Sequence, residues 1–165
     1  KHQPKAVIFS DAGPDVRWVG NERGYAYETN WAPLDRDKTF PGDPNYPNMA
    51  AGREDGTHWV PAEVDVSIRP GWYYHAAEDD KVKSADSLMR IWHASVGRGG
   101  NLLLNIPVDR RGLIHSADSA SLIGFRKLRD AAFAKNLALR QTAKASTTRP
   151  GTSVKNLLDG DPDTH

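Results

Sequence analysis

The sequence of 165 residues has a formal net charge of +1, from 22 Lys and Arg against 21 Asp and Glu, and no cysteine. Because the basic residues are scattered, the chain lacks the positive patch that binding to nucleic acid or to an anionic membrane requires. No stretch approaches the ~20 apolar residues that span a bilayer, and the N-terminus lacks the apolar core of a signal peptide. The absence of cysteine excludes disulfide and thiolate chemistry but leaves the compartment open.

The first 56 residues predict one buried strand followed by long loops. An apolar run, Ala6–Ser10, lies between proline and glycine residues, as is typical of a strand buried on both faces. Residues 15–24 would then form the loop at its carboxyl end. Residues 25–56 are rich in Pro, Gly, Asn and Asp and lack periodicity, so we expect a long irregular loop of the kind that often carries function.

The middle of the chain predicts a strand, a second strand-end loop and a helix. Apolar and polar residues alternate over 64–68, and Pro70 and Gly71 then end this strand. Residues 72–75 therefore lie in a loop at its carboxyl end. Residues 84–96 carry the apolar stripe of an amphipathic helix, with Ser84 as the N-cap and Gly97 as the stop signal.

A further strand and helix complete the pattern. Residues 101–106 form a nearly continuous apolar strand, and Ser116 is placed to cap a helix with Leu122, Phe125, Leu128 and Ala132 on one face. Strands that alternate with helices predict an α/β fold with parallel strands, although these units are too few to close a barrel. After residue 139 the chain becomes polar, as in a linker or the edge strand of a new domain.

The first group of chemically useful side chains lies in the loop GPDVRWVGNERG, residues 13–24. Barrel enzymes keep catalytic groups at the carboxyl ends of buried strands, which is where this loop is expected. Glu22 is the best candidate for a general acid, because an indole such as that of Trp18 would exclude water and favour the protonated carboxyl. The alternative is a solvated carboxylate paired with Arg17 or Arg23.

The second group lies in WVPAEVDVSIRPGWYYH, residues 59–75. Glu63 and Asp65 share one strand face, where Arg69 would neutralise one of them, and we interpret both carboxylates as structural. The aromatic run Trp72, Tyr73 and Tyr74, with His75, would wall a sugar site, because the C–H face of a sugar packs on aromatic rings. Core packing of these aromatic rings is the alternative.

No cofactor or metal is predicted. The six histidines are dispersed and form no ligand pattern. The glycine-rich stretch at residues 97–100 precedes a strand instead of opening a helix, so it does not form the phosphate-binding loop that a helix N-terminus would provide.

Three motifs in order resemble glycoside hydrolase family 29, the α-L-fucosidases. They are GPDVRWVGNERG, EVDVSIRPGWYYH and GRGGNLLLNIPVDRRGLI, and the resemblance covers Ala6 to Leu139. It implies a TIM-like (β/α) barrel, of which residues 1–139 would be the C-terminal part. It also implies a retaining mechanism, in which an Asp nucleophile forms a fucosyl-enzyme and Glu22 serves as acid/base. The first motif is most similar to the subfamily that cleaves α-1,3/1,4-linked fucose.

The resemblance implies that this chain is incomplete as an enzyme. The family's nucleophile and its fucose-binding histidines lie upstream of Lys1, so the chain alone is expected to be inactive and to need the N-terminal half of the barrel as its partner. The substrate would be a fucosylated glycan, contacted by Arg17, Trp18, Trp72, Tyr73 and His75. Family members suggest a periplasmic or secreted location. The rival functions are a non-catalytic carbohydrate-binding or scaffold fragment and a different retaining glycosidase.

The tail, residues 140–165, is expected to be a linker and the start of a second module. Its sequence KASTTRPGTSVKNLLDGDPDTH resembles the opening of a discoidin-like (F5/8 type C) β-sandwich. A single edge of such a sandwich cannot bury its apolar face, so we expect this stretch to be poorly ordered or to lean on the barrel part.

Overall fold

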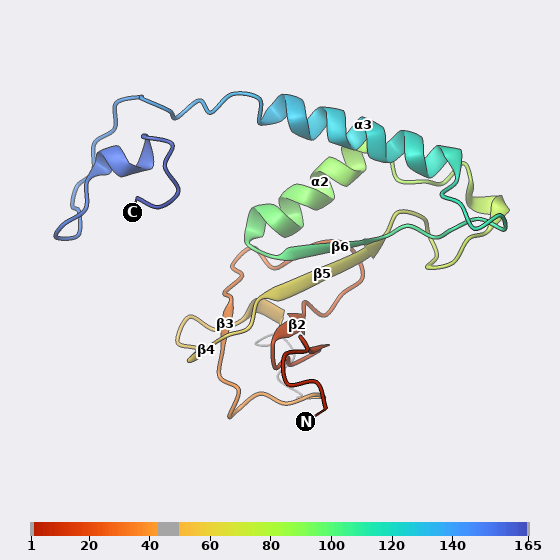
Figure 1. The fold of residues 1–165 in the computed structure, drawn as a ribbon, viewed down its shortest axis with the longest axis horizontal. Coiled ribbons are helices and arrows are strands. Elements are labelled where there is room, and N and C mark those ends of the chain that lie inside the picture. Colours follow the sequence, from red (N-terminus) through yellow and green to blue (C-terminus); the bar gives the residue numbers. More distant parts are fainter. Residues whose placement is uncertain (1, 43–49, 165) are drawn as a thin grey trace. The chain divides into compact units, whose positions relative to one another are not determined.

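The computed structural model describes residues 2–42 and 50–164, and the chain divides into two compact units, Lys1–Leu128 and Arg129–His165. A four-stranded parallel sheet forms the centre of the first unit (Figure 1). Its strands, in spatial order, are β1 Phe9–Ser10, β2 Val16–Trp18, β5 Ala62–Ser67 and β6 Asn101–Asn105. The α/β class with parallel strands is therefore confirmed.

Both predicted helices are present, and the cap of the first is as expected. Helix α2 spans Ala85–Ser95, and Ser84 Oγ accepts from the backbone N–H of Ser87. It continues into the 3₁₀ turn η2, Val96–Arg98, so Gly97 is not the stop. The chain turns instead at Gly99, whose φ of +74° favours glycine. Helix α3 spans Ser116–Ala132, so Ser116 is its first residue, and His115 Nδ1 accepts from the N–H of Ala117.

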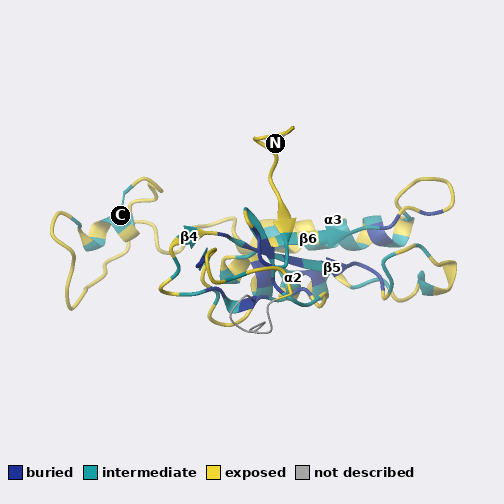
Figure 2. Cartoon of the chain, turned by 90° about the horizontal axis from the view of Figure 1, so that it is seen from below, coloured by how far each residue is buried: buried dark blue, intermediate teal, exposed yellow. Residues whose placement is uncertain are grey.

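Strand β5 alternates as predicted, and one of its faces forms the core. Val64 and Val66 are buried together with Ala62, whereas Glu63 and Asp65 on the other face are half-buried. Val19, Ala26 and Leu102 pack with Ala62 and Val64 in one apolar cluster. The buried segments follow β5 through the centre of the first unit in Figure 2. The register pairs Glu63 with Asn101 and Ser67 with Asn105, so their side chains share a face.

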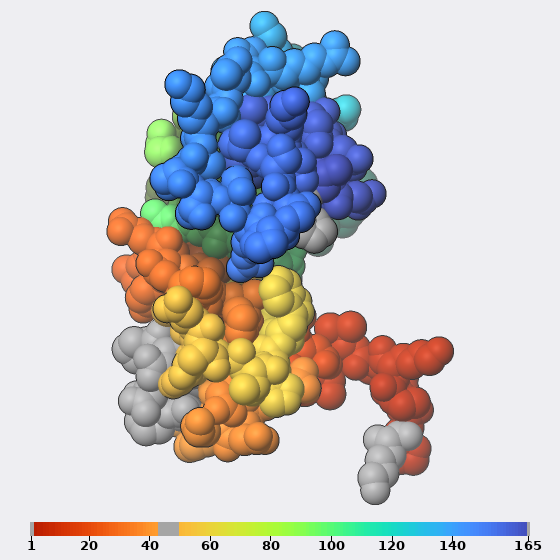
Figure 3. All heavy atoms as spheres, turned by 90° about the vertical axis from the view of Figure 1, so that its left-hand side faces the viewer, coloured from red at the N-terminus to blue at the C-terminus, as the bar shows by residue number. Residues whose placement is uncertain are grey.

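The N-terminal prediction was partly wrong. Only Phe9 and Ser10 of the expected strand at residues 6–10 are extended, and the strand is not buried on both faces, because Val7, Ile8 and Phe9 are 74%, 52% and 48% exposed. The N-terminal residues project from the first unit in Figure 3. The expected loop at 15–24 contains β2, which the sequence does not reveal because three residues, Val-Arg-Trp, are too few to show a period.

The long segment 25–56 is not a uniform loop. Pro33–Leu34 forms β3 and pairs antiparallel with β4, His58–Trp59, in a separate two-stranded sheet. The segment is also fixed by Arg17, which is fully buried on β2. Its guanidinium donates to Asn30 Oδ1 at 3.0 Å, to the carbonyl of Trp31 at 2.7 Å and to the carbonyl of Val60. Burial lowers the pKa of Arg17 to about 10.

In the second unit, the described residues after α3 form turns and one 3₁₀ helix, η3 Val154–Leu157, without a strand. Ser153 Oγ accepts from the N–H of Lys155 and so caps η3. The expected opening strands of a β-sandwich are therefore not seen among these residues.

The apolar face predicted for α3 is only partly covered, since Leu122 and Phe125 are half-buried but Leu128 and Ala132 are exposed. No helix within the described residues has the length and apolarity to cross a membrane.

Candidate active site

The loop after β2 is held directly against the sheet and α2. Gly24 has φ +82°, and a Cβ there would lie 3.0 Å from Ile91 on α2 and 3.2 Å from Val66 on β5. Two further contacts fix the turn, because Ala26 N–H donates to the carbonyl of Ala94, and Asn21 Nδ2 donates to the carbonyl of Tyr25. Glu22 is therefore presented from a closely packed turn beside the carboxyl end of β2.

Glu22 is bonded by a tryptophan from the next strand-end loop. Trp72 Nε1 donates to Glu22 Oε2 at 2.8 Å, although Glu22 itself is exposed. Among the residues that the structure describes, no hydrogen bond reaches Glu22 Oε1. The carboxylate thus has one oxygen fixed by an indole and one oxygen open to a second molecule.

Trp18, the tryptophan of the first motif, has a different partner. Trp18 Nε1 donates to Asp65 Oδ1 at 2.6 Å, so Trp72, not Trp18, supplies the indole that bonds Glu22. Glu63, on the same face, accepts from Asn101 Nδ2 at 2.9 Å. The prediction that Glu63 and Asp65 share a face is confirmed, but the expectation that Arg69 neutralises one of them was wrong.

Arg69 instead joins the loop after β5 to helix α3. It is fully buried, and it donates to both oxygens of the equally buried Asp118 and, at 2.9 Å, to Asp79. Its guanidinium also lies 4.8 Å from the centre of the Tyr74 ring. Burial opposes the charge of Arg69, yet hydrogen bonds with Asp118 and Asp79 raise its pKa overall. These contacts fix residues 74–79 at the strand end.

For the part of the chain that the structure describes, Arg17 and Arg23 contact groups other than Glu22, against the alternative of a carboxylate paired with one of these arginines. Arg17 donates to Asn30 Oδ1 and to the carbonyls of Trp31, Ala32 and Val60. Arg23 lies with its guanidinium 5.0 Å from the Tyr25 ring centre. Arg17 is completely buried and its contacts hold its own chain together, so its expected role as a substrate contact stays an untested prediction.

The remaining predicted sugar-contacting residues surround Trp72 in sequence. Trp72 is half-buried, while Tyr73 is 81% exposed and His75 is exposed. His75 precedes the short 3₁₀ helix η1, Ala76–Glu78, and its carbonyl accepts from Arg69 at 3.3 Å. Tyr73 and His75 are thus accessible side chains on the loop that also supplies the hydrogen bond to Glu22.

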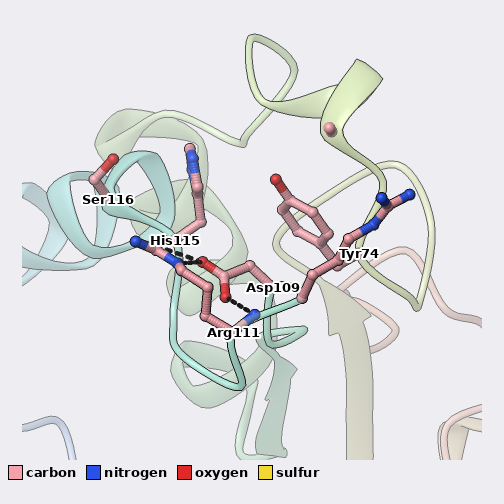
Figure 4. Close-up of a pocket in the computed structure, with 7 residues that line it drawn as sticks. Tyr74, Asp109, Arg111, His115 and Ser116 are labelled. Carbon is pink, nitrogen blue, oxygen red and sulfur yellow. Dashed lines mark hydrogen bonds and ion pairs between the residues drawn. The ribbon is translucent and has the colours of Figure 1, made fainter.

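A cavity of about 470 Å³ lies beyond this loop (Figure 4). Tyr74 and His115 line it together with the ion pair between Asp109 and Arg111, but Glu22 and Trp72 do not. Hydrogen bonds from Arg111 and from the backbone N–H groups of Arg111 and Leu113 lower the pKa of Asp109 to about 2. Sequence reasoning missed this cavity, because residues from two separate strand-end loops build it.

Comparisons with known proteins agree on one family. The family model described as alpha-L-fucosidase matches residues 21–126. Alpha-L-fucosidase 1 of Arabidopsis thaliana is 45% identical over 163 residues, which cover 95% of this chain and 31% of that protein. A solved structure named SpGH29 is 36% identical with a TM-score of 0.87 over 96% of this chain and 34% of the other. The chain therefore spans about a third of each relative's length.

A second solved structure from the same family is similar at lower sequence identity. It is a GH29 fucosidase of Ruminococcus gnavus in complex with fucose, 31% identical with a TM-score of 0.68 over 80% of this chain and 26% of that chain.

Proposed function

Because the chain belongs to the alpha-L-fucosidase family, glycoside hydrolase family 29, we propose that it forms part of a retaining hydrolase that releases terminal α-L-fucose from glycans, with Glu22 as the general acid/base. The hydrogen bond from Trp72 to Glu22 is the main support for Glu22 as the acid/base residue. It joins a carboxylate to an indole at the carboxyl ends of parallel strands, where barrel enzymes place their catalytic groups.

The two oxygens of Glu22 have separate tasks in this proposal. Oε2 accepts from Trp72, which fixes the orientation of the carboxyl group. Oε1 gives its proton to the glycosidic oxygen as the bond to fucose breaks, and it later removes a proton from the water that attacks the fucosyl-enzyme. The nucleophilic carboxylate, ~5 Å away in a retaining enzyme, comes from outside this chain, so the chain alone is inactive.

The substrate contacts come from the loop around Trp72. Trp72 and the exposed Tyr73 offer ring faces to the C–H face of a sugar, and His75 offers a ring nitrogen to a hydroxyl. Trp18 is half-buried on the same sheet face as Asp65 and offers a further ring edge. The likeness of GPDVRWVGNERG to one subfamily supports α-1,3/1,4-linked fucose as the substrate.

The four parallel strands are proposed to form part of a (β/α) barrel. In such a barrel, α2 would lie on the outside, against the apolar face of β5. The polar face with Glu63, Asp65 and Ser67 would line the barrel interior. The missing strands would come from the segment that the longer relatives have in addition. A periplasmic or secreted location is proposed from the family alone, and residues 140–165 are proposed as the start of a discoidin-like module.

Activity is best tested in a chimera in which this chain replaces the matching segment of SpGH29. We expect the chimera to release 4-nitrophenol from 4-nitrophenyl α-L-fucoside and the chain alone to release none. Glu22→Gln should lower turnover of a fucosylated oligosaccharide by roughly 10²–10⁴-fold. Glu54→Gln, at an exposed glutamate outside the site, is the matched control.

Azide distinguishes an acid/base from a merely structural glutamate. In Glu22→Ala, azide should restore part of the activity and give a fucosyl azide of retained configuration, because an anionic nucleophile needs no general base. Full activity of Glu22→Gln would eliminate the assignment. A chimera that binds fucosylated glycan but hydrolyses nothing would favour the carbohydrate-binding alternative, and hydrolysis of other aryl glycosides in preference to the fucoside would favour a different retaining glycosidase.

A further inference from the structure

Asn105, the last residue of β6, reaches across to the loop that carries Trp72. Its amide nitrogen Nδ2 lies 2.9 Å from the carbonyl oxygen of Trp72 and 3.1 Å from Ser67 Oγ. The β5–β6 register explains the reach, because Asn105 pairs with Ser67 at the carboxyl end of both strands. One side chain therefore contacts the end of β5 and the loop that follows it.

The contacts of Asn105 require an amide nitrogen at this position. The Trp72 carbonyl can only accept a hydrogen bond. Ser67 Oγ uses its own hydrogen to donate to the carbonyl of Gly71 at 2.7 Å, so it too must accept from Asn105. Two acceptors facing one nitrogen need both of its N–H groups. Aspartate has the same shape but only oxygens, so it would set a carboxylate oxygen against the Trp72 carbonyl oxygen with no hydrogen between them.

Trp72 links Asn105 to Glu22, because it forms a hydrogen bond with each of them. Its backbone is held by Asn105 and its indole nitrogen is held at Glu22 Oε2. Building on the proposed function, we propose that Asn105 is a positioning residue, which sets the place of Trp72 and through it the orientation of the Glu22 carboxyl group. Asn105 touches neither the reacting atoms nor Glu22.

The chain contains a matched control on the same strand. Asn101 lies four residues earlier on the same face of β6, and its Nδ2 donates to Glu63. Its bond lies at the opposite end of the strand from Trp72. Asn101→Ala and Asn105→Ala therefore delete the same group from the same face, and only the second deletion removes a contact with the Trp72 loop.

The first experiment needs no enzyme activity. In the full chain with ¹⁵N-labelled tryptophan indoles, Trp72→Phe identifies the Trp72 signal, and Glu22→Gln should shift that signal if the hydrogen bond is present. Asn105→Ala and Asn105→Asp should also shift or broaden it and leave the other four indole signals in place, whereas Asn101→Ala should leave it unchanged. An unmoved Trp72 signal in folded Asn105→Asp overturns the proposal, as does global unfolding of Asn105→Ala, which would make Asn105 a structural residue.

The second experiment uses the SpGH29 chimera and separates kcat from KM. Asn105→Asp should lower kcat on the order of 100-fold, the effect of a catalytic group displaced by about 1 Å, with a much smaller change in KM. A loss confined to KM would overturn the proposal. If Glu22→Gln keeps full activity while Asn105→Asp still moves the Trp72 signal, the proposed function fails but the structural link between Asn105 and Trp72 stands. If Glu22→Gln is inactive and Asn105→Asp is fully active, only the positioning role fails.

Discussion

The indole nitrogen of Trp72 donates a 2.8 Å hydrogen bond to Glu22 across 50 residues of sequence. Each partner is fixed independently, Glu22 by the turn that Gly24 packs against α2 and β5, and Trp72 by the bond from Asn105. The two strand-end loops thus meet at a pair of side chains whose alignment depends on the tertiary fold.

Replacing Trp72 with phenylalanine should weaken catalysis without changing the fold. The variant keeps an aromatic ring but loses the N–H that holds Glu22 Oε2. A hydrogen bond to a charged group contributes ~1.5–3 kcal/mol, so we expect kcat in the chimera to fall by roughly 10-fold or more. Trp59→Phe, at an exposed tryptophan on β4, is the control. Equal kcat values for the two variants would contradict the role of the Trp72 N–H.

Arg69 should contribute more to stability than any exposed arginine. In Arg69→Met the buried Asp118 loses its partner, and breaking a buried ion pair costs about 3–5 kcal/mol of unfolding free energy. Urea denaturation followed by circular dichroism measures this loss. Arg53→Met, which removes a more exposed ion pair with Asp55, should move the urea midpoint far less. Similar midpoints for both variants would disprove the structural role of Arg69.

Asp109 should make the stability of the chain sensitive to acid. Its folded pKa is about 2, held down mainly by the hydrogen bond from Arg111, and its unfolded pKa is about 3.9. Because the folded pKa is the lower one, its stabilising effect is complete above pH ~4 and is lost as the pH falls toward 2. Asp109→Asn should be less stable at pH 7 and should lose less stability between pH 4 and 2. Parallel acid-unfolding curves for the two proteins would refute this.

Two glycines in the left-handed backbone conformation allow the cost of a steric clash to be measured apart from the cost of backbone strain. Gly52 has φ +69°, and a Cβ there would lie 1.9 Å from the carbonyl oxygen of Trp31. Gly42 has φ +79°, and within the described ranges 2–42 and 50–164 no atom lies within 4 Å of the same position. We expect Gly42→Ala to cost about 1–2 kcal/mol from the left-handed conformation alone and Gly52→Ala to cost clearly more. Equal urea midpoints would mean that the backbone near Trp31 moves aside freely.

The parts of the fold that depend on local sequence could be predicted. The period of α2 and its Ser84 cap, and the alternation of β5, are signals contained within each element. β2 and the β3–β4 pair were missed, because short strands owe their pairing to distant partners; β3 and β4 lie more than 20 residues apart. The N-terminal strand was expected to be buried because it is apolar, yet the residues described here do not cover it.

In the candidate site, too, the local features could be predicted and the contacts between distant residues could not. Glu22 was predicted from its motif, and the structure places it at the carboxyl end of β2, although its catalytic role stays a prediction. The indole that bonds it could not be identified, because Trp18 is nearer in sequence but its strand directs it to Asp65, while Trp72 approaches from another loop. Arg17 and Arg69 are the hubs of buried contacts, and the sequence carries no signal that distinguishes such arginines from surface ones.

The buried guanidinium of Arg17 limits how the chain can change at this position. Its nitrogens serve oxygen atoms of Asn30, Trp31 and Val60 at once. Lysine would keep the positive charge but has a single nitrogen on a flexible stem, so it could not satisfy such a planar arrangement of acceptors. The conformation of residues 30–32 therefore depends on the planar guanidinium of Arg17. Apolar substitutions nearby should be tolerated more readily than the exchange of this arginine for lysine.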